Sequence, residues 1–224
     1  MPEHRQIKAT AMKNLKGKWL TAIILTLFSL VLGVYVFAPT PSIAVSLEDI
    51  QANPALLVDL KTLFRFDRAF IRSVIFFLLG APAMVSLCGA YQMLCEGKEF
   101  TWKSAFCRWY LMYKAIGLRV LRTLIVAVGL LLVIVPGIVA HYTFGMSSWI
   151  LADNPDMSIS GALRMSRSMM RGHKMELLTL DLSFAPWALV TLLTVGGGLF
   201  FYSPSHRAAR AAYYMELKKI PILR

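Results

Sequence analysis

The feature that most constrains this chain is a set of long segments with almost no charge. Trp19–Ala38 and Thr123–Ala152 contain no Asp, Glu, Lys or Arg over 20 and 30 residues, and Leu177–Tyr202 contains only Asp181. A helix of about 20 apolar residues spans the hydrocarbon core of a bilayer. The core of a soluble domain needs no runs of this length, so the sequence predicts helices embedded in a membrane.

The composition agrees with this prediction. Hydrophobic residues make up 57% of the 224 residues and charged residues 16%, whereas soluble domains average about 45–50% and about 25%. The formal net charge is +12, and the basic residues flank the apolar segments. We therefore expect contacts with the lipid bilayer and its anionic headgroups, with room for membrane-protein partners. Nucleic acid is excluded as a partner because no recognition-module pattern is present.

The predicted fold class is an all-α, polytopic transmembrane bundle that takes in residues 1–224 as a single membrane-embedded domain. Its membrane helices are expected at 19–38, 69–95, 123–135, 138–152, 174–194 and 198–218. This six-helix arrangement is preferred. The alternative has four spans, in which residues 123–152 form one long helix that kinks and tilts.

Two observations favour six helices and one opposes them. Helix-breaking residues stand where six helices need turns, and these residues are Pro136, Gly137, Gly196, Gly197 and Gly198. With both termini inside, six helices leave 20 Lys and Arg inside and 3 outside, whereas four spans leave 16 and 7. Cytoplasmic loops carry the excess of Lys and Arg. Against this, residues 138–152 give only about 22 Å of helix.

The segment 1–18 is basic and has a helical apolar stripe. Ile7, Ala11 and Leu15 recur every four residues and so share one helix face. This pattern predicts a basic amphipathic helix on the membrane surface. A charged helix that simply leads into the first span is equally consistent with it.

Residues 158–172 predict a second basic helix, lying in the plane of the membrane. Ser158 or Ser160 can cap its start, and Gly172 can end it. Its less polar face is formed by Ile159, Leu163, Ser166 and Met170. The arginines lie mostly on the opposite face.

Asp181 is unusual because a carboxylate inside an apolar run is costly and faces protein or water. If 174–194 and 198–218 form a hairpin, Asp181 lies about 10 Å from the level of Lys174 and Arg210 about 12 Å from that of Lys218. We expect Asp181 and Arg210, with Arg207 nearby, to form a buried polar cluster. It is either an ion pair that fixes helix register or a binding site for an anionic ligand or headgroup. In the third alternative, Asp181 simply lies near the interface.

No catalytic pattern stands out in the sequence. It lacks a phosphate-binding loop, a zinc-protease pair and a nucleophile elbow, and its four histidines are scattered. Cys88 and Cys95 suit small packing residues, without a His or carboxylate cluster beside them. We therefore expect no catalytic residues, no metal site, no cofactor and no enzyme activity.

Several motifs in order along the chain resemble a known family. They include Leu15-Lys16-Gly17-Lys18-Trp19, Pro136-Gly137-Ile138, Ile150-Leu151-Ala152-Asp153-Asn154-Pro155, Gly172-His173-Lys174 and Leu180-Asp181-Leu182-Ser183-Phe184 with Trp187. In sequence and spacing the chain resembles the bacterial membrane proteins grouped as domain of unknown function 975. This resemblance implies a multi-helix protein of the bacterial cytoplasmic membrane and implies no activity.

The function expected from these observations is that of a non-enzymatic membrane scaffold or accessory protein, which contacts anionic lipid or envelope partners. One alternative is a transporter or permease component with a polar intramembrane site, because broken helices and intramembrane charges are typical of transporters. Another is a membrane-embedded enzyme on lipid substrates. The protein is expected in the bacterial inner membrane, crossing it several times, with both termini cytoplasmic.

Overall fold

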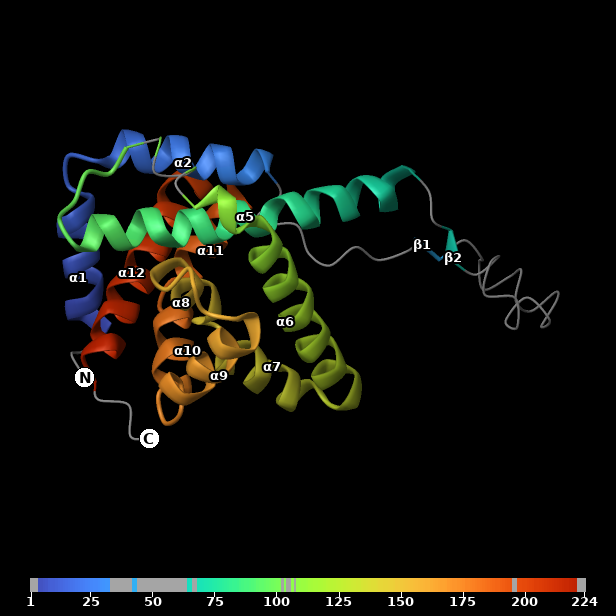
Figure 1. Cartoon of the computed structure of the whole chain (residues 1–224). Coiled ribbons are helices and arrows are strands. Elements are labelled where there is room, and N and C mark those ends of the chain that lie inside the picture. Colours follow the sequence, from blue (N-terminus) through green and yellow to red (C-terminus); the bar gives the residue numbers. More distant parts are fainter. Residues whose placement is uncertain are drawn as a thin grey trace, which may run out of the picture.

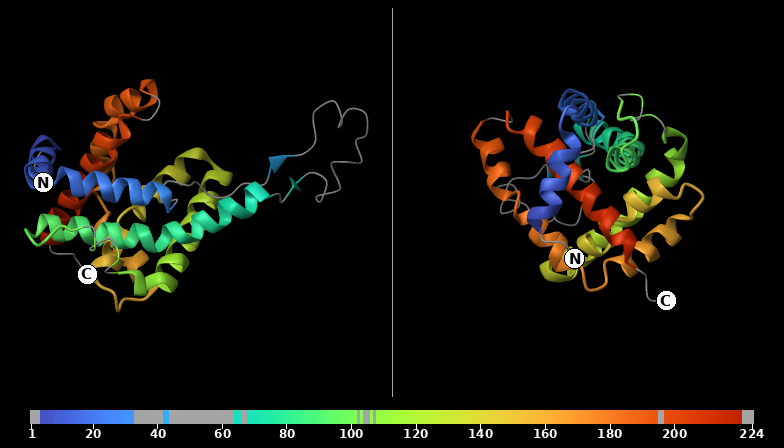
Figure 2. Two further views of the ribbon diagram at one scale, coloured as in Figure 1. Left: turned by 90° about the horizontal axis from the view of Figure 1, so that it is seen from above. Right: turned by 90° about the vertical axis from the view of Figure 1, so that its left-hand side faces the viewer.

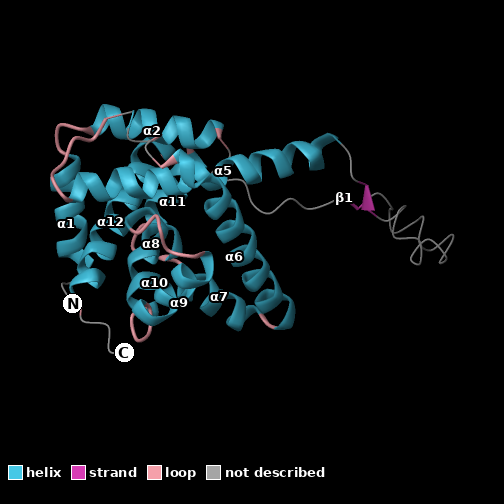
Figure 3. Ribbon diagram, in the orientation of Figure 1, coloured by secondary structure: helices cyan, strands magenta, loops and turns pink. Residues whose placement is uncertain are grey.

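The computed structural model describes residues 4–32, 42–43, 64–65, 68–101, 103, 106, 108–194 and 197–220. Within these residues the chain is helical apart from one antiparallel pair of two-residue strands, in which Ser42 lies opposite Arg65. Turns and loops connect the helices (Figure 3). The predicted all-α fold class is therefore confirmed, whereas the number of membrane crossings stays a prediction.

The elements follow one another along the chain as shown in Figure 1. They are α1 (His4–Leu15), α2 (Trp19–Val31), β1 (Ser42–Ile43), β2 (Phe64–Arg65), α5 (Arg68–Cys95), η3 (Trp109–Leu111), α6 (Met112–Leu132), α7 (Ile134–Thr143), α8 (Ser147–Asp153), α9 (Ile159–Met169), α10 (Lys174–Leu182), α11 (Ala185–Leu193) and α12 (Leu199–Lys219).

Two of these helices are long and apolar enough to cross a bilayer. They cover Ile71–Cys95 and Trp109–Leu132, and Trp19–Ser29 is a shorter apolar helix. The first agrees with the predicted span 69–95. The end of the predicted span 19–38 lies outside the described residues, which stop at residue 32 in this part of the chain.

Helix α12 is the centre of the packing and contacts α1, α2, α5 and α11. Ala208, Ala209 and Ala211 are fully buried on it, and their small side chains let neighbouring helices approach closely. The two views of Figure 2 show α12 running diagonally through the molecule with α1 beside it. Its bounds agree with the predicted helix 198–218.

Helix α1 packs on protein and does not lay its apolar stripe on a membrane surface. Ile7, Ala11 and Leu15 are at most 3% exposed, and α1 contacts α12, α5 and α10. Lys8 donates a hydrogen bond to the Ser183 carbonyl at 2.8 Å, and burial lowers the pKa of this lysine. The surface-helix prediction was wrong because helical periodicity shows that a stripe is buried, not whether lipid or protein buries it.

Helix α9 begins and ends where the sequence predicts. The Ser158 hydroxyl accepts a hydrogen bond from the Gly161 amide at 3.1 Å, which caps the helix, and Gly172 follows the last turn with φ +85°. Its less polar face is buried against α8 and α6, while Arg164 and Arg167 are exposed. The less polar face, which was expected to meet the membrane, therefore contacts protein. As in α1, the helical period of the apolar residues does not distinguish burial by lipid from burial by protein.

The run 123–152 is a helical hairpin followed by a third short helix. Val133, in extended conformation, separates α6 from α7, so the break precedes Pro136, which occupies the first turn of α7 where proline is tolerated. Gly137 lies against α6 so closely that an added Cβ would lie 2.8 Å from the Leu130 amide nitrogen.

Two of the predicted boundaries in this run were wrong. The helix predicted at 123–135 starts at Met112, and the one predicted at 138–152 is interrupted after Thr143 and resumes as α8 at Ser147. Hydropathy carries no signal for this interruption, and Gly145, a poor helix former, is the single helix-breaking residue among Phe144, Gly145 and Met146.

The last hairpin turns at the glycine run, as predicted. Helix α11 ends at Leu193 and α12 begins at Leu199. An added Cβ on Gly198 would lie 2.8 Å from the Thr191 Cα, so only glycine fits where α11 and α12 approach each other here. Gly196 lies outside the described residues. The predicted helix 174–194 is divided into α10 and α11 by a turn at Ser183 and Phe184.

Candidate functional site

Asp181 is bound by two side chains of α12. The Arg210 guanidinium donates from Nε to Asp181 Oδ1 at 3.0 Å and from Nη2 to Oδ2, which is a bidentate ion pair. The Asp181 and Arg210 side chains are 16% and 18% exposed. The pairing inferred from their depths in the hairpin is therefore present in the structure.

His206 is a further partner of Asp181, with 2.9 Å between His206 Nε2 and Asp181 Oδ1. An ionised carboxylate can only accept hydrogen bonds, so Nε2 carries the proton. The imidazole stacks on the Tyr202 ring and meets the Phe184 ring edge-on, with 5.4 Å between ring centroids in each pair. His206 of α12 is thereby held against α10 and the turn that follows it.

Arg207 has a different environment from Arg210. It is 8% exposed, and its Nη1 donates to the Met84 sulfur of α5 at 3.6 Å. Of the three predicted site residues, the structure thus brings Asp181 and Arg210 together and places Arg207 toward α5. Their predicted role in ligand binding remains a hypothesis.

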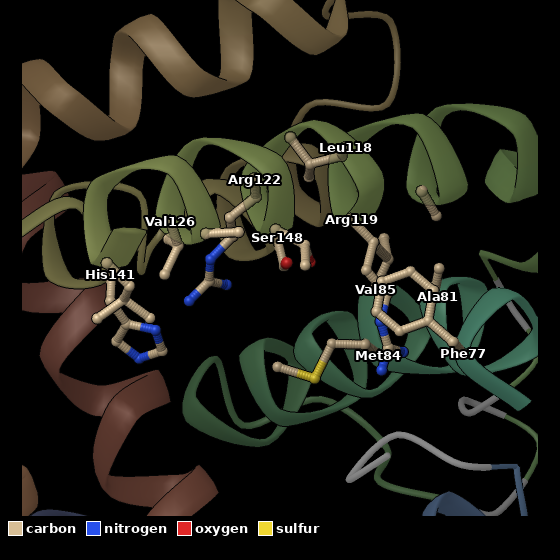
Figure 4. A pocket seen from close by; sticks show the side chains of 14 residues that line it. Phe77, Ala81, Met84, Val85, Leu118, Arg119, Arg122, Val126, His141 and Ser148 are labelled. Carbon is tan, nitrogen blue, oxygen red and sulfur yellow. The ribbon is translucent and has the colours of Figure 1, made fainter. Parts of the chain in front are cut away.

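A cavity of about 420 Å³ lies beside this cluster, between α5, α6, α7 and α8. Most of its wall is apolar and comes from α5 and from successive turns of α6. Its charged or titratable lining residues are Arg119, Arg122 and His141. Figure 4 shows both arginine side chains reaching from α6 into the space above α5.

The cavity is electropositive. No Asp or Glu of the described part of the chain lines it. The Arg119 guanidinium lies over the Phe77 ring, 4.4 Å from its centroid. The Arg122 guanidinium makes no hydrogen bond or ion pair with any of the residues that the structure describes, and it lies close enough to Arg119 and Arg210 for repulsion.

The family comparison concerns the part of the chain that supplies most of this site. Residues 112–220 match the family model described as protein of unknown function (DUF975). Over these residues, just under half of the chain, the comparison supports the resemblance to this family. No curated protein and no solved structure gives a match.

The DUF975 region runs from α6 through α12, so it holds Arg119, Arg122, His141 and the Asp181 cluster. The α5 wall of the cavity, with Phe77 and Met84, lies outside the matched residues. The site is therefore assembled from the DUF975 region together with the preceding long helix.

Sequence reasoning missed the cavity and its arginines. In the sequence Arg119 and Arg122 belong to the basic residues that flank the apolar segments, although their spacing of three residues places them on one helix face. That spacing was the available signal. The described residues contain no group of three or more His, Cys, Asp or Glu that could hold a metal ion.

Proposed function

We propose that this protein is a multi-pass integral membrane protein that acts without enzymatic chemistry, as a scaffold or accessory protein that holds anionic lipid and contacts envelope partners. We place it in the bacterial cytoplasmic membrane with both termini cytoplasmic. The observation that carries this proposal is the amount of apolar side chain left exposed on particular helices.

The exposed apolar side chains come from one part of each long helix. On α6 Ala115 and Leu118 are buried near its start, whereas Leu131 near its end is 89% exposed. On α5 the residues from Ala81 onward are mostly buried, whereas Ile71, Ile75 and Leu79 are exposed. Helices α2, α7 and α11 add further exposed leucines, isoleucines and valines. Monomeric soluble proteins rarely expose this much contiguous apolar surface, so lipid is the solvent that suits it.

Polar contacts support a common side for four basic segments, which are residues 1–18, 96–122, 153–176 and 203–224. Lys114 donates to the Pro155 carbonyl at 2.7 Å, which joins the segment 96–122 to 153–176. Lys218 pairs with Asp153 at 2.8 Å, which joins the C-terminal end of α12 to the same segment. Lys18 donates to the Lys98 carbonyl at 3.5 Å. Segments in direct contact share one side of a membrane, which favours six helices over four, because four spans separate 153–176 from the others.

The non-enzymatic part of the proposal is supported by the chemistry of the cavity. Guanidinium groups bind anions but keep their protons at any physiological pH. They favour holding an anionic group over general acid–base chemistry. A permease component is the second candidate, favoured by the cavity itself; substrate-dependent flux into vesicles that contain the protein would support it.

Membrane extraction tests the proposal. The full chain should remain with the membrane fraction in alkaline carbonate and leave it only with detergent, because the exposed apolar helices need lipid or its substitute. A chain that stayed monomeric in buffer without detergent would overturn the proposal.

A further inference from the structure

We propose that the cavity between α5, α6, α7 and α8 binds the phosphate-bearing headgroup of one anionic membrane lipid, with Arg122 and Arg119 as its ligands. This inference rests on the proposed membrane location and goes further by naming a site and a class of ligand. It is separate from the Asp181 cluster, in which Arg210 already has its carboxylate.

The first argument is charge. Among the residues that the structure describes, Arg122 has no ion pair and no carboxylate lines the cavity, and Arg122 is repelled by Arg119 and Arg210. An uncompensated cation in a largely apolar environment is costly, both inside proteins and inside membranes. A bound anion would remove this cost, and the empty space beside Arg122 is where it would lie.

The second argument is geometry. Arg119 and Arg122 are one turn apart on α6, and Figure 4 shows them entering the cavity from the same helix. A guanidinium presents a planar fork of N–H donors that matches phosphate oxygens. Each group can donate to phosphate oxygens in this cavity, and Thr123 of α6 and Ser148 of α8 add hydroxyl groups to its lining.

The third argument is the apolar wall, which indicates an amphiphile. Along α6 the lining runs from the buried residues Ala115 and Leu118 to Leu130, which is 47% exposed among the apolar residues of this helix. A headgroup at the arginines would therefore have its acyl chains directed along α6 toward lipid. The volume of about 420 Å³ lies within the range of about 300–1,000 Å³ that is common for ligand pockets.

The experiment is native mass spectrometry of the full chain in neutral detergent, titrated with phosphatidylglycerol or with phosphatidylcholine. The first phosphatidylglycerol should bind at least about tenfold more tightly than the first phosphatidylcholine, since charge-assisted hydrogen bonds to both arginines are lost otherwise. Arg122→Gln should abolish this preference, and Arg122→Lys should keep part of it. Arg164→Gln is the matched control, because Arg164 is exposed on α9.

A second variant tests the site independently, in case Arg122→Gln does not fold. Val126→Phe fills the cavity and leaves both arginines in place, so it should also weaken binding of the first phosphatidylglycerol. Equal loss in Arg164→Gln and Arg122→Gln would overturn the proposal, because the lipid would then be held by surface charge. Equal binding of the two lipids by the wild-type chain would overturn it as well.

A separate arm distinguishes lipid from a free anion. Inorganic phosphate or glycerol 3-phosphate, at the same concentration, should not displace the bound phosphatidylglycerol, because neither reaches the apolar wall. Displacement would overturn the lipid as ligand and assign the site to a soluble phosphate. A chain that resists carbonate extraction but shows no lipid preference overturns this inference alone, whereas a chain soluble without detergent overturns the proposed function.

Discussion

Asp181 is the carboxylate on which two cationic or polar side chains of α12 converge. Arg210 holds both of its oxygens and His206 holds one of them. Removing one member of a buried pair costs far more than replacing both, because the remaining charge loses its partner without regaining water. The cluster therefore joins α10 to α12 through a contact that tolerates no single loss.

Asp181→Asn tests this directly. It keeps the shape of the side chain but leaves Arg210 without a counter-charge, so we expect the free energy of unfolding to fall by about 3 kcal/mol, measured by denaturant titration in detergent. The double variant Asp181→Leu with Arg210→Met should lie closer to wild type than Asp181→Asn does. Equal losses in the single and double variants would show that the pair itself is not the source of the stability.

The sequence predicts part of this site and not the rest, for reasons visible at single residues. The rise of a helix is constant for each residue, so the depths of Asp181 and Arg210 in the hairpin follow from residue counts. These depths alone predicted that the two side chains pair. His206 lies one turn before Arg210 and shares its face, so the same reasoning reaches it only once the register is known. The cavity joins α5 to α6 and α8, and no local pattern tells which faces of distant helices leave a space.

At the scale of elements, α1 and the α6–α7 hairpin each depend on close packing that can be tested with one side chain. The ends of α9 at Ser158 and Gly172 are predicted correctly from the sequence, because a helix cap and a left-handed residue depend only on residues within one turn. The end of α7 at Thr143 and the docking of α1 depend on partners far along the chain. Such features were therefore mispredicted from periodicity.

Leu15→Ala separates docking of α1 on protein from a location on the membrane surface. Leu15 is fully buried, so its truncation should lower the free energy of unfolding by about 2–5 kcal/mol. Leu20→Ala is the control, because Leu20 on α2 is 74% exposed and its loss should cost little in detergent. An unchanged unfolding midpoint in Leu15→Ala would contradict the docking of α1 on α12.

Gly137→Ala tests the close approach within the α6–α7 hairpin. The added methyl group would meet the Leu130 backbone nitrogen at 2.8 Å, and backbone cannot move as cheaply as a side chain. We expect a loss of about 1–3 kcal/mol in the same titration. Gly117→Ala is the matched control on α6, because there the methyl group meets mainly the end of the flexible Ile159 side chain. If both variants behaved alike, the hairpin would not be as tightly closed as described.

At the scale of the whole molecule, burial and polar contacts divide the chain in the same way. Most of the exposed large apolar residues lie on α2, the first half of α5, the second half of α6, α7 and α11, with a few on α10 and α12. The segments joined by polar contacts lie around Lys18, Lys114, Asp153 and Lys218. A bilayer around the first group and cytoplasm around the second would satisfy both at once. The arginines of the cavity lie on α6 between the buried residues Ala115 and Leu118 and the exposed apolar end of the helix, and such a bilayer would therefore have its headgroups near them.

Cysteine labelling tests this division in intact cells. In a background with Cys88, Cys95 and Cys107 replaced by alanine, Arg164→Cys on α9 should react with a membrane-impermeant maleimide only after the membrane is opened. Six helices place this residue inside with the N-terminal segment, whereas four spans place it outside. Arg65→Cys is the matched reporter, since the charge count places residues 39–68 outside, and it should react in intact cells. Labelling of Arg164→Cys from outside would require Asp153 and Lys218, which are in contact, to lie on opposite sides of the membrane, and would eliminate the six-helix arrangement.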